Sequence, residues 1–328
     1  MGKKIDTFPD PPQAEHTIFS LNIQRWIIPA IVLASEEKIF EYVAKSPVTI
    51  EEIAEHFKVE PRAAEAIVSV AAALCFLKRL EAGRFGLTDL GYTYFDPNSP
   101  FCFSFPKNLK EDMLFKKLRD GFHGAECPNV YFNDDGRRWK YTLHLPIAGA
   151  LKQQKAFKQV RKLLDVGGGS GLMSFGIAAG NPNIRCTVMD FGEVCSSALE
   201  NSTRYGLEDR IDTLAADMFK DAWPPGYDAM LFANVFHCWE PDACRQLVRR
   251  AFDSLEPSGR IFICDIFLNE SKDGPLTSAC FSVMLLTFFR GKTYTIGELK
   301  KMLTKGGFVD FQSVHCFGEY HLISAKKP

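Results

Sequence analysis

The stretch LLDVGGGSGLMSFGIA, residues 163–178, determines the fold class that this sequence predicts. It begins as an apolar run typical of a buried strand, continues through Gly167, Gly169 and Gly171, and ends in the apolar pattern of a helix. Glycine permits a tight turn and lets a ligand lie against main-chain N–H groups. Strand, glycine turn and helix together predict a ligand-binding loop in an α/β sheet.

The spacing within this loop argues against a nicotinamide dinucleotide. Residues 165–171 read D-x-G-x-G-x-G, whereas the dinucleotide pattern is G-x-G-x-x-G. Asp165 lies inside the strand that precedes the glycines, where a carboxylate would face a bound cation and would repel a pyrophosphate. Because a glycine motif alone is weakly specific, the neighbouring strands have to identify the ligand.

Acidic residues follow the next two predicted strands. Asp190 ends the second strand, where a carboxylate can accept both ribose hydroxyls, and Phe191 comes directly after it. Asp217 ends the third strand, where it can accept from an adenine amino group, with Met218 and Phe219 as apolar walls. Each acid alone could instead cap a helix or lie in a solvated turn. Together they predict a ligand with an adenosine, a cationic part and no phosphate, a description that S-adenosylmethionine fits.

The part of the chain beyond residue 160 alternates between strand and helix patterns, which is typical of a doubly wound sheet. The last two strands are expected to form a closing antiparallel pair. The predicted strands are residues 162–167, 185–190, 210–217, 228–236, 260–267, 308–317 and 320–327.

The part before residue 100 has the pattern of short helices followed by a strand pair. A helical region over 12–34 is interrupted by Pro29, and a second helix begins after Thr49. Residues 61–80 predict a third helix, and 81–91 predict a strand pair punctuated by glycine, so the order is that of a winged helix. From 46 to 95 there are five Lys or Arg against seven Asp or Glu. This acidic balance argues against nucleic-acid binding and favours a packing or dimerisation module.

Composition sets further limits. The chain has 328 residues, 46% apolar and 24% charged, with a formal net charge of −1, so it predicts a globular protein without attraction to an anionic membrane. The N-terminal residues lack the apolar core of a signal peptide. The run ACFSVMLLTFF at 279–289 is too short to span a bilayer and predicts a buried helix. Ten cysteines without a CxxC pair indicate ordinary thiols in a reducing cytosol, so we expect a cytoplasmic protein.

The stretch NVFHCWEPDAC, residues 234–244, raises the question of the role of His237. A metal-ligand role is not supported, because Cys238 and Cys244 lack partners at metal-ligand spacing. His237 ends the fourth strand on the same rim as the cofactor acids, which favours a general base over a packed core histidine. The acidic cluster FNDDG at 132–136 is interpreted as a solvated turn, so we expect transfer without a metal.

With these motifs in place, the sequence resembles the class I S-adenosylmethionine-dependent small-molecule O-methyltransferases of plants, fungi and bacteria. The resemblance rests on LLDVGGGSG, MDFGEV, ADMF, the segment from FHCWEPDAC to IFICD, GKTYTIGELKKMLTKGGF and the N-terminal module. It implies an α/β fold with a seven-stranded sheet in the order 3-2-1-4-5-7-6. It also implies a mostly α-helical winged-helix domain through which the chain forms a homodimer.

The resemblance further implies three parts. These are a winged-helix dimerisation domain over 1–104, connecting helices that contribute to the substrate pocket over 105–155, and an S-adenosylmethionine-binding methyltransferase domain over 156–328.

By the same resemblance, His237 deprotonates a substrate hydroxyl and Asp265 orients it. The sequence departs from the family pattern at Cys238, where the family has aspartate, and at Thr293, where it has a second carboxylate. The lysine that many plant members carry in the fourth strand is also absent, with Ala233 and Asn234 at that place.

These departures leave two alternatives open. The first is S- or C-methylation of a small acceptor without a strong base, in which Arg137, Arg138 or Arg290 could hold a substrate carboxylate. The second is a member of the fold that keeps the cofactor site but catalyses a reaction other than methylation.

Overall fold

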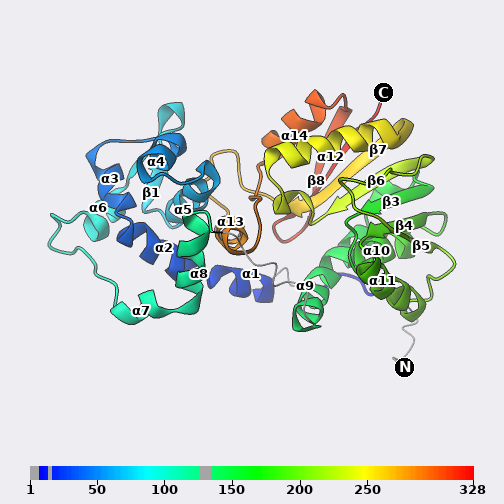
Figure 1. Ribbon diagram of the computed structural model, residues 1–328, viewed down its shortest axis with the longest axis horizontal. Coiled ribbons are helices and arrows are strands. Elements are labelled where there is room, and N and C mark those ends of the chain that lie inside the picture. Colours follow the sequence, from blue (N-terminus) through cyan, green and yellow to red (C-terminus); the bar gives the residue numbers. More distant parts are fainter. Residues whose placement is uncertain (1–6, 14–16, 126–133) are drawn as a thin grey trace. The chain divides into compact units, whose positions relative to one another are not determined.

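The computed structural model describes residues 7–13, 17–125 and 134–328 (Figure 1). The chain forms two compact units. The sheet unit comprises 1–16, 131–266 and 297–328, and the helical unit comprises 17–130 and 267–296. Each unit is therefore assembled from separate stretches of sequence, and the segment 267–296 belongs with the N-terminal helices. The expected division at residues 104 and 155 stays a prediction.

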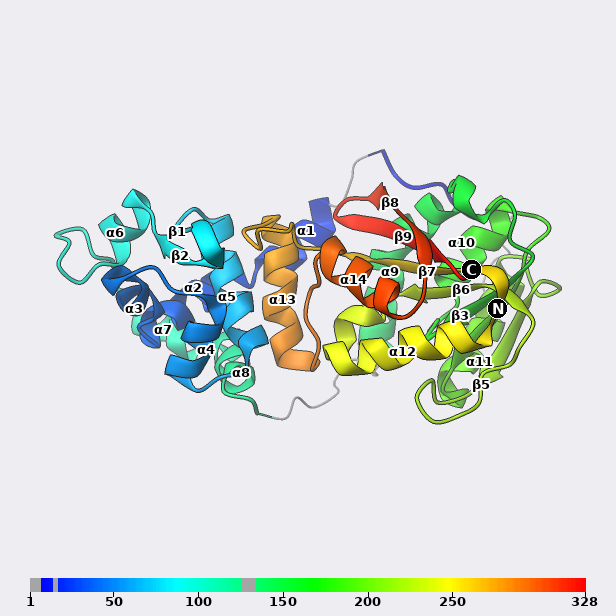
Figure 2. The same ribbon diagram turned by 90° about the horizontal axis from the view of Figure 1, so that it is seen from above.

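The sheet unit is built on seven strands in the order β5-β4-β3-β6-β7-β9-β8 (Figure 2). β3 to β7 run parallel, and β9 lies antiparallel between β7 and β8. Numbered along the chain, this order is the predicted 3-2-1-4-5-7-6, so the fold class is confirmed. The strands are β3 (Lys162–Val166), β4 (Arg185–Asp190), β5 (Ile211–Ala215), β6 (Tyr227–Ala233), β7 (Leu255–Ile266), β8 (Val309–Phe317) and β9 (Tyr320–Lys326).

The central strands are mostly apolar, as expected where helices cover both faces of a sheet. Leu163 and Leu164 on β3 and Met230 on β6 are fully buried. The helices α12 and α14 lie on one side of the sheet, and α9, α10 and α11 lie on the other (Figure 1). Their bounds are α9 (Asp134–Lys152), α10 (Leu172–Gly180), α11 (Gly192–Arg204), α12 (Pro241–Ser254) and α14 (Ile296–Lys305).

The helices α9 and α10 approach each other closely because of glycine. A Cβ atom added to Gly176 would lie 2.0 Å from the carbonyl oxygen of Ala148, which is far inside van der Waals contact. The helix α10 begins directly after the glycine loop. Its close packing against α9 therefore fixes the position of the helix at the end of the predicted cofactor loop.

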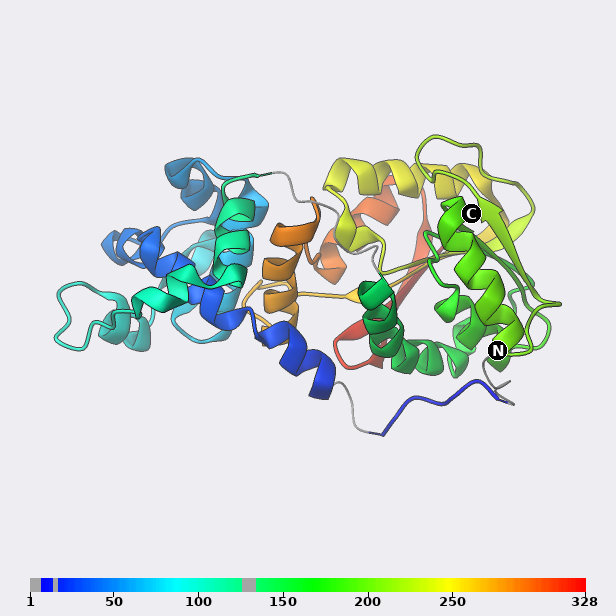
Figure 3. The ribbon, with the colours of Figure 1, turned by 60° about the horizontal axis from the view of Figure 1, so that its bottom comes forward.

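The helical unit contains the helices of the N-terminal part of the chain together with one later helix and a two-stranded sheet (blue to cyan, and orange, in Figure 3). Thr49 and Glu52 form a capping box that starts α4, as the sequence predicts. The described helices and strands of this unit are α1 (Thr17–Gln24), α2 (Ile27–Glu36), α3 (Ile39–Lys45), α4 (Ile50–Phe57), α5 (Pro61–Ala73), β1 (Leu77–Arg79), β2 (Phe85–Leu87), α6 (Asp89–Phe95), α7 (Lys107–Glu111), α8 (Met113–Phe122) and α13 (Leu276–Phe288).

The expected helix over 61–80 is too long. α5 ends at Ala73, and the N–H of Phe76 donates back to the carbonyl of Ala71 while Cys75 takes a left-handed φ of 60°. This helix end turns the chain so that Leu77–Arg79 forms β1 and pairs with Phe85–Leu87. The strand pair predicted over 81–91 therefore starts earlier than expected, and its last residues begin α6.

Two apolar segments of the helical unit bear on membrane association. α13 is buried along nearly its whole length, so the helix expected over 279–289 is confirmed as a core helix. Among the described residues, the stretch Ile18–Glu36, which contains α1 and α2, is long and apolar enough to cross a membrane by length and composition. Half of that stretch is buried inside the protein, and the expected absence of membrane binding stays a prediction.

Candidate active site

The glycine loop turns sharply between β3 and α10. Gly167, Gly169 and Gly171 have φ values of +69°, +58° and +76°, a left-handed conformation that glycine adopts without the strain most other residues would incur. A Cβ atom on Gly169 would meet nothing within 4 Å, whereas one on Gly171 would lie 2.7 Å from the ring of Phe175. The loop therefore packs closely against its own helix on one side and faces open space at Gly169.

The structure places Asp190 directly against this loop. Its Oδ2 accepts from the N–H of Gly169 at 2.9 Å, and its Oδ1 accepts from the N–H of Phe191 at 2.8 Å. Each carboxylate oxygen has two lone pairs, so the group can also accept a hydrogen bond from a sugar hydroxyl. The side chain of Phe191 is 58% exposed, which is high for a phenylalanine. The structure thus brings the loop and the predicted ribose site together.

The third predicted segment also reaches the loop. Met218 Sδ lies 3.9 Å from the position of a Cβ atom on Gly167. Asp217 accepts from the N–H of Phe219 at 2.9 Å and pairs with Lys220 at 3.1 Å, and these bonds hold the pKa of that carboxyl below its usual range. Met218, the next residue, lies beside the glycine loop, and the interaction of Asp217 with an adenine stays a prediction.

Asp165 lies beneath the loop and is fully buried. Its Oδ2 accepts from the hydroxyl of Ser174 at 2.7 Å, and its Oδ1 has no hydrogen-bond partner. Burial raises the pKa of Asp165 to about 7, with Ser174 opposing the change and Asp190 adding to it. A Cβ atom on Gly168 would lie 2.6 Å from its Cγ, so the carboxyl group supports the loop from below. The expected contact of Asp165 with a bound cation stays a prediction.

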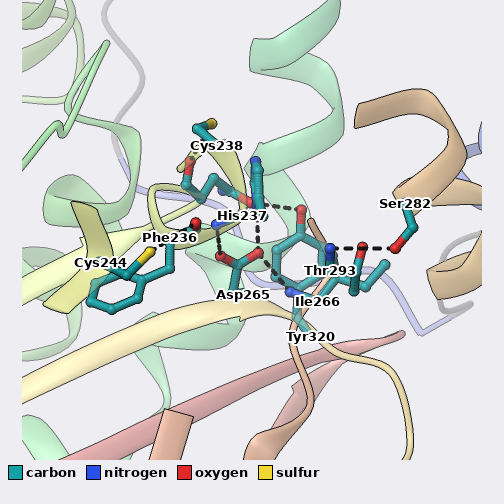
Figure 4. Close-up of polar contacts among 10 residues, drawn as sticks. Phe236, His237, Cys238, Cys244, Asp265, Ile266, Ser282, Thr293 and Tyr320 are labelled. Atoms are coloured by element: carbon teal, nitrogen blue, oxygen red, sulfur yellow. Dashed lines mark hydrogen bonds and ion pairs between the residues drawn. The ribbon is translucent and has the colours of Figure 1, made fainter. Parts of the chain in front are cut away.

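His237 lies on the short 3₁₀ helix η4 (Phe236–Cys238) that follows β6. Its Nδ1 is 2.6 Å from Oδ1 of Asp265, and both side chains are buried (Figure 4). The Asp265 carboxylate also accepts from the main-chain N–H of His237 at 3.4 Å and from that of Ile266 at 2.8 Å. An ionised carboxylate can only accept, so Nδ1 of His237 donates and Nε2 remains as the basic atom.

The electrostatics of His237 follow from this pairing. Burial disfavours the charged imidazolium and by itself lowers the pKa of His237. The Asp265 carboxylate and Cys238 outweigh burial, and they raise the pKa of His237 to about 10. The imidazole is therefore a stronger base than a free histidine, and a smaller fraction of it is neutral at pH 7.

The remaining predicted positions lie away from the glycine loop in sequence, and of these Arg290 is an exposed residue of the helical unit. Thr293 belongs to the helical unit, where its N–H donates to Ser282 Oγ at 3.3 Å and its own Oγ1 is buried without a hydrogen-bond partner (Figure 4). The side chains of Arg137 and Arg138 and those of the acidic cluster at 132–136 lie outside the described residues. Within the described part of the chain, no group of three or more His, Cys, Asp or Glu could hold a metal ion.

The sequence predicted no role for two residues near His237, Asn234 and Tyr320. Tyr320 donates to the side chain of Asn234, which lies three residues before His237, at 2.8 Å. Asn234 has a left-handed φ of 58°, a conformation in which asparagine is enriched, so an asparagine inside the predicted strand 228–236 was a usable signal that the strand ends at Ala233. Tyr320 gave no local signal, because its partner lies 86 residues away in sequence.

Comparison with known proteins accords with this geometry. Residues 137–309 match the family model described as an O-methyltransferase domain. The 3-hydroxy-5-methyl-1-naphthoate 3-O-methyltransferase of Streptomyces sahachiroi is 26% identical over 311 residues, which are 88% of this chain and 88% of that protein. The L-tyrosine C(3)-methyltransferase of Streptomyces lavendulae is 34% identical over 149 residues, which are 45% of this chain and 41% of that protein.

A solved structure extends the similarity to the whole chain. The O-methyltransferase family 2 protein from Planctomyces limnophilus, in complex with apigenin, has a TM-score of 0.88 and 25% sequence identity, with 100% of both chains covered. The family model alone spans more than half of the present chain. The chain therefore belongs to the S-adenosylmethionine-dependent O-methyltransferases that act on small molecules.

Proposed function

We propose that this protein transfers the methyl group of S-adenosylmethionine to a hydroxyl of a small aromatic acceptor, with His237 as the general base and without a metal. The observation that carries the proposal is the buried pair of His237 and Asp265 at 2.6 Å, which leaves Nε2 as the basic atom. The aromatic class is supported by the relatives, since one is a hydroxynaphthoate 3-O-methyltransferase and one binds apigenin.

The raised pKa of His237 suits a phenolic acceptor. A phenol such as tyrosine has a pKa of about 10, close to that of His237 in this site. Proton transfer from such a hydroxyl to Nε2 is therefore nearly balanced, and the Asp265 carboxylate stabilises the imidazolium that forms. A positioned base of this kind typically contributes a factor of about 10²–10⁴ to the rate.

The cofactor would be held by the rim around the glycine loop. The bound cofactor supplies a methyl group on a cationic sulfur. Asp190 would accept from the ribose hydroxyls and Phe191 would cover the adenosine, while the open space at Gly169 leaves room for the ligand. Asp217 and Met218 would contact the adenine, as their position beside Gly167 supports.

C-methylation is a second candidate because one relative is an L-tyrosine C(3)-methyltransferase with 34% identity. Deprotonation of a phenol also activates the ring carbon next to the hydroxyl, so the same base would serve both reactions. Transfer to a thioether and a non-methylating reaction have no such relative among those described above.

A direct assay separates these functions. The protein is incubated with S-adenosylmethionine carrying a labelled methyl group and a panel of hydroxylated aromatic acids and flavonoids, and each product is analysed by NMR. We expect a methoxy signal. A ring-methyl signal would move the assignment to C-methylation, and the absence of any labelled product across phenols, thiols and thioethers would refute the proposal.

We also propose a homodimer formed through a winged-helix N-terminal domain, without affinity for nucleic acid or membranes, in the cytoplasm. Ile18 and Leu21, one turn apart on α1, are 73% and 63% exposed, and Ile28 in the first turn of α2 is 48% exposed. Exposed apolar side chains of this kind are typical of a surface that a partner covers. Light scattering should give twice the chain mass for the wild type and the monomer mass for Leu21→Glu, and a monomeric wild type would contradict the dimer.

A further inference from the structure

Asn234 is the first residue after β6, where the turn toward His237 begins. Its φ of 58° is left-handed, and its N–H donates to the carbonyl of Cys264 on β7 at 3.0 Å. Its side-chain Oδ1 accepts from the phenol of Tyr320 at 2.8 Å. The backbone of Asn234 is thus fixed by β7 and its side chain by β9.

Tyr320 is the first residue of β9 and is completely buried. It stands opposite Ile266 in the antiparallel pairing of β9 with β7, so it is next to the strand position that carries Asp265. Burial, with a contribution from Asp265, raises the pKa of Tyr320 well above its ordinary value, and the phenol therefore stays protonated and donates. A buried hydroxyl without an acceptor is costly, which ties this side chain to Asn234.

The turn that follows Asn234 is short and carries the base. The N–H of Cys238 donates to the carbonyl of Val235 at 3.1 Å, and the thiol of Cys238 lies 3.7 Å from the carbonyl of Asn234. Within this turn, the main-chain N–H of His237 and its Nδ1 both point at Asp265 (Figure 4). The direction in which the chain leaves Asn234 therefore sets where the imidazole meets the carboxylate.

We propose that Tyr320 is a positioning residue for the base: by holding the side chain of Asn234, it fixes the turn that directs His237 onto Asp265. The inference rests on the proposed role of His237 as the base. It assigns to β9, at the far end of the sequence, a part in the chemistry that the family resemblance does not give it. Tyr320 acts through Asn234 and need not touch the acceptor.

The test compares two variants that each remove one phenol hydroxyl. Tyr320→Phe deletes the bond to Asn234, and Tyr227→Phe deletes a matched bond of 2.9 Å to Thr187 at the opposite end of β6. We expect Tyr320→Phe to lower kcat by about ten- to hundredfold, because small misplacements of reacting groups are that costly. KM for the cofactor should stay unchanged, and Tyr227→Phe should retain wild-type kcat.

A second readout does not depend on turnover. The pKa of His237 is followed by NMR of the labelled imidazole, identified by its absence in His237→Gln. In Tyr320→Phe, a loosened contact with Asp265 should lower this pKa from the raised value toward 6.5, whereas Tyr227→Phe should leave it unchanged. Equal imidazole pKa values and equal kcat in the two variants would overturn the proposal.

Variants of Asn234 separate the side-chain bond from the backbone conformation. Asn234→Gly keeps the left-handed φ and removes the acceptor, whereas Asn234→Ala strains the backbone as well. We expect Asn234→Ala to be slower than Asn234→Gly, and Tyr320→Phe to have little further effect on kcat in the Asn234→Gly protein. Multiplicative losses in the double variant would contradict action through Asn234.

These outcomes are distinguishable from failure of the proposed function. If His237→Gln methylates at the wild-type rate, His237 is not the base and the function proposed above falls. If His237→Gln loses turnover while Tyr320→Phe behaves like Tyr227→Phe, only the positioning role is wrong.

Discussion

The rim that surrounds the glycine loop and the turn that carries His237 lie in the same unit but are held in different ways. The rim is held largely by contacts between main-chain N–H groups and carboxylates, and Asp190 lies 21 residues from its partner Gly169. The turn is held by side chains from strands that come later, since Asp265 lies 28 residues from His237 and Tyr320 lies 86 residues from Asn234. Binding the cofactor and removing the proton are therefore separable tasks.

Removal of the proposed base should have the largest effect on the separation between proton removal and cofactor binding. His237→Gln should lower kcat by about 10²–10⁴-fold, because glutamine cannot accept the proton of the acceptor. The affinity for S-adenosylhomocysteine, measured by calorimetry, should stay within about twofold of wild type, because the proposed cofactor rim is held by Asp190 and the glycine loop. A large loss of affinity would show that the turn also builds the cofactor site, and the separation would be wrong.

Removing the orienting carboxylate should have the next largest effect. Asp265→Asn keeps the shape of the side chain but loses the charge that stabilises the imidazolium and fixes its tautomer. We expect kcat to fall by about a hundredfold, with little change in cofactor affinity. Asp253→Asn, an exposed residue on α12, is the matched control and should behave as wild type. An Asp265→Asn protein with full activity would remove the carboxylate from the mechanism.

A change in the rim should lower cofactor affinity and leave kcat nearly unchanged, the opposite of a change at His237. Asp190→Ala removes the acceptor for the N–H of Gly169 and the proposed acceptor for the ribose. Loss of about one or two hydrogen bonds to a charged group should weaken cofactor binding by at least about tenfold. At saturating cofactor, kcat should change much less than in His237→Gln. Unchanged calorimetric affinity would mean that the ribose lies elsewhere.

The sequence predicted the sheet because its strands follow from local patterns, and the same patterns bring the proposed cofactor residues to one rim, where their contacts with the cofactor stay predictions. Apolar runs of strand length gave every strand of the seven-stranded sheet, and the glycines with positive φ lie where the motif placed them. The cofactor acids follow their strands, so the strand predictions alone placed Asp190 and Met218 beside the loop. The pair of His237 and Asp265 came from the family resemblance, and the structure brings the two side chains together.

What the sequence did not predict depends on contacts between distant residues. The burial of Asp165 under the loop follows from the packing of Ser174 and Gly168 around it, which no spacing reveals. The end of α5 at Ala73 follows from the left-handed turn at Cys75, since the residues beyond it have apolar character that a helix would also accept. The bond from Tyr320 to Asn234 joins two strands that are not neighbours in sequence.

The central claim is that His237, with its pKa raised by Asp265, is the base for methyl transfer. The most direct test is the pH dependence of single-turnover methyl transfer at saturating cofactor and acceptor. His237 must be neutral to act, and its pKa is raised to about 10, so the wild-type rate should climb steadily from pH 6 toward pH 10. The residual rate of His237→Gln should also rise with pH, because the acceptor phenol itself ionises near pH 10, but at pH 7 it should stay about 10²–10⁴-fold below the wild-type rate. A wild-type rate that does not change between pH 6 and pH 10, or that levels off above pH 6.5, would contradict the account.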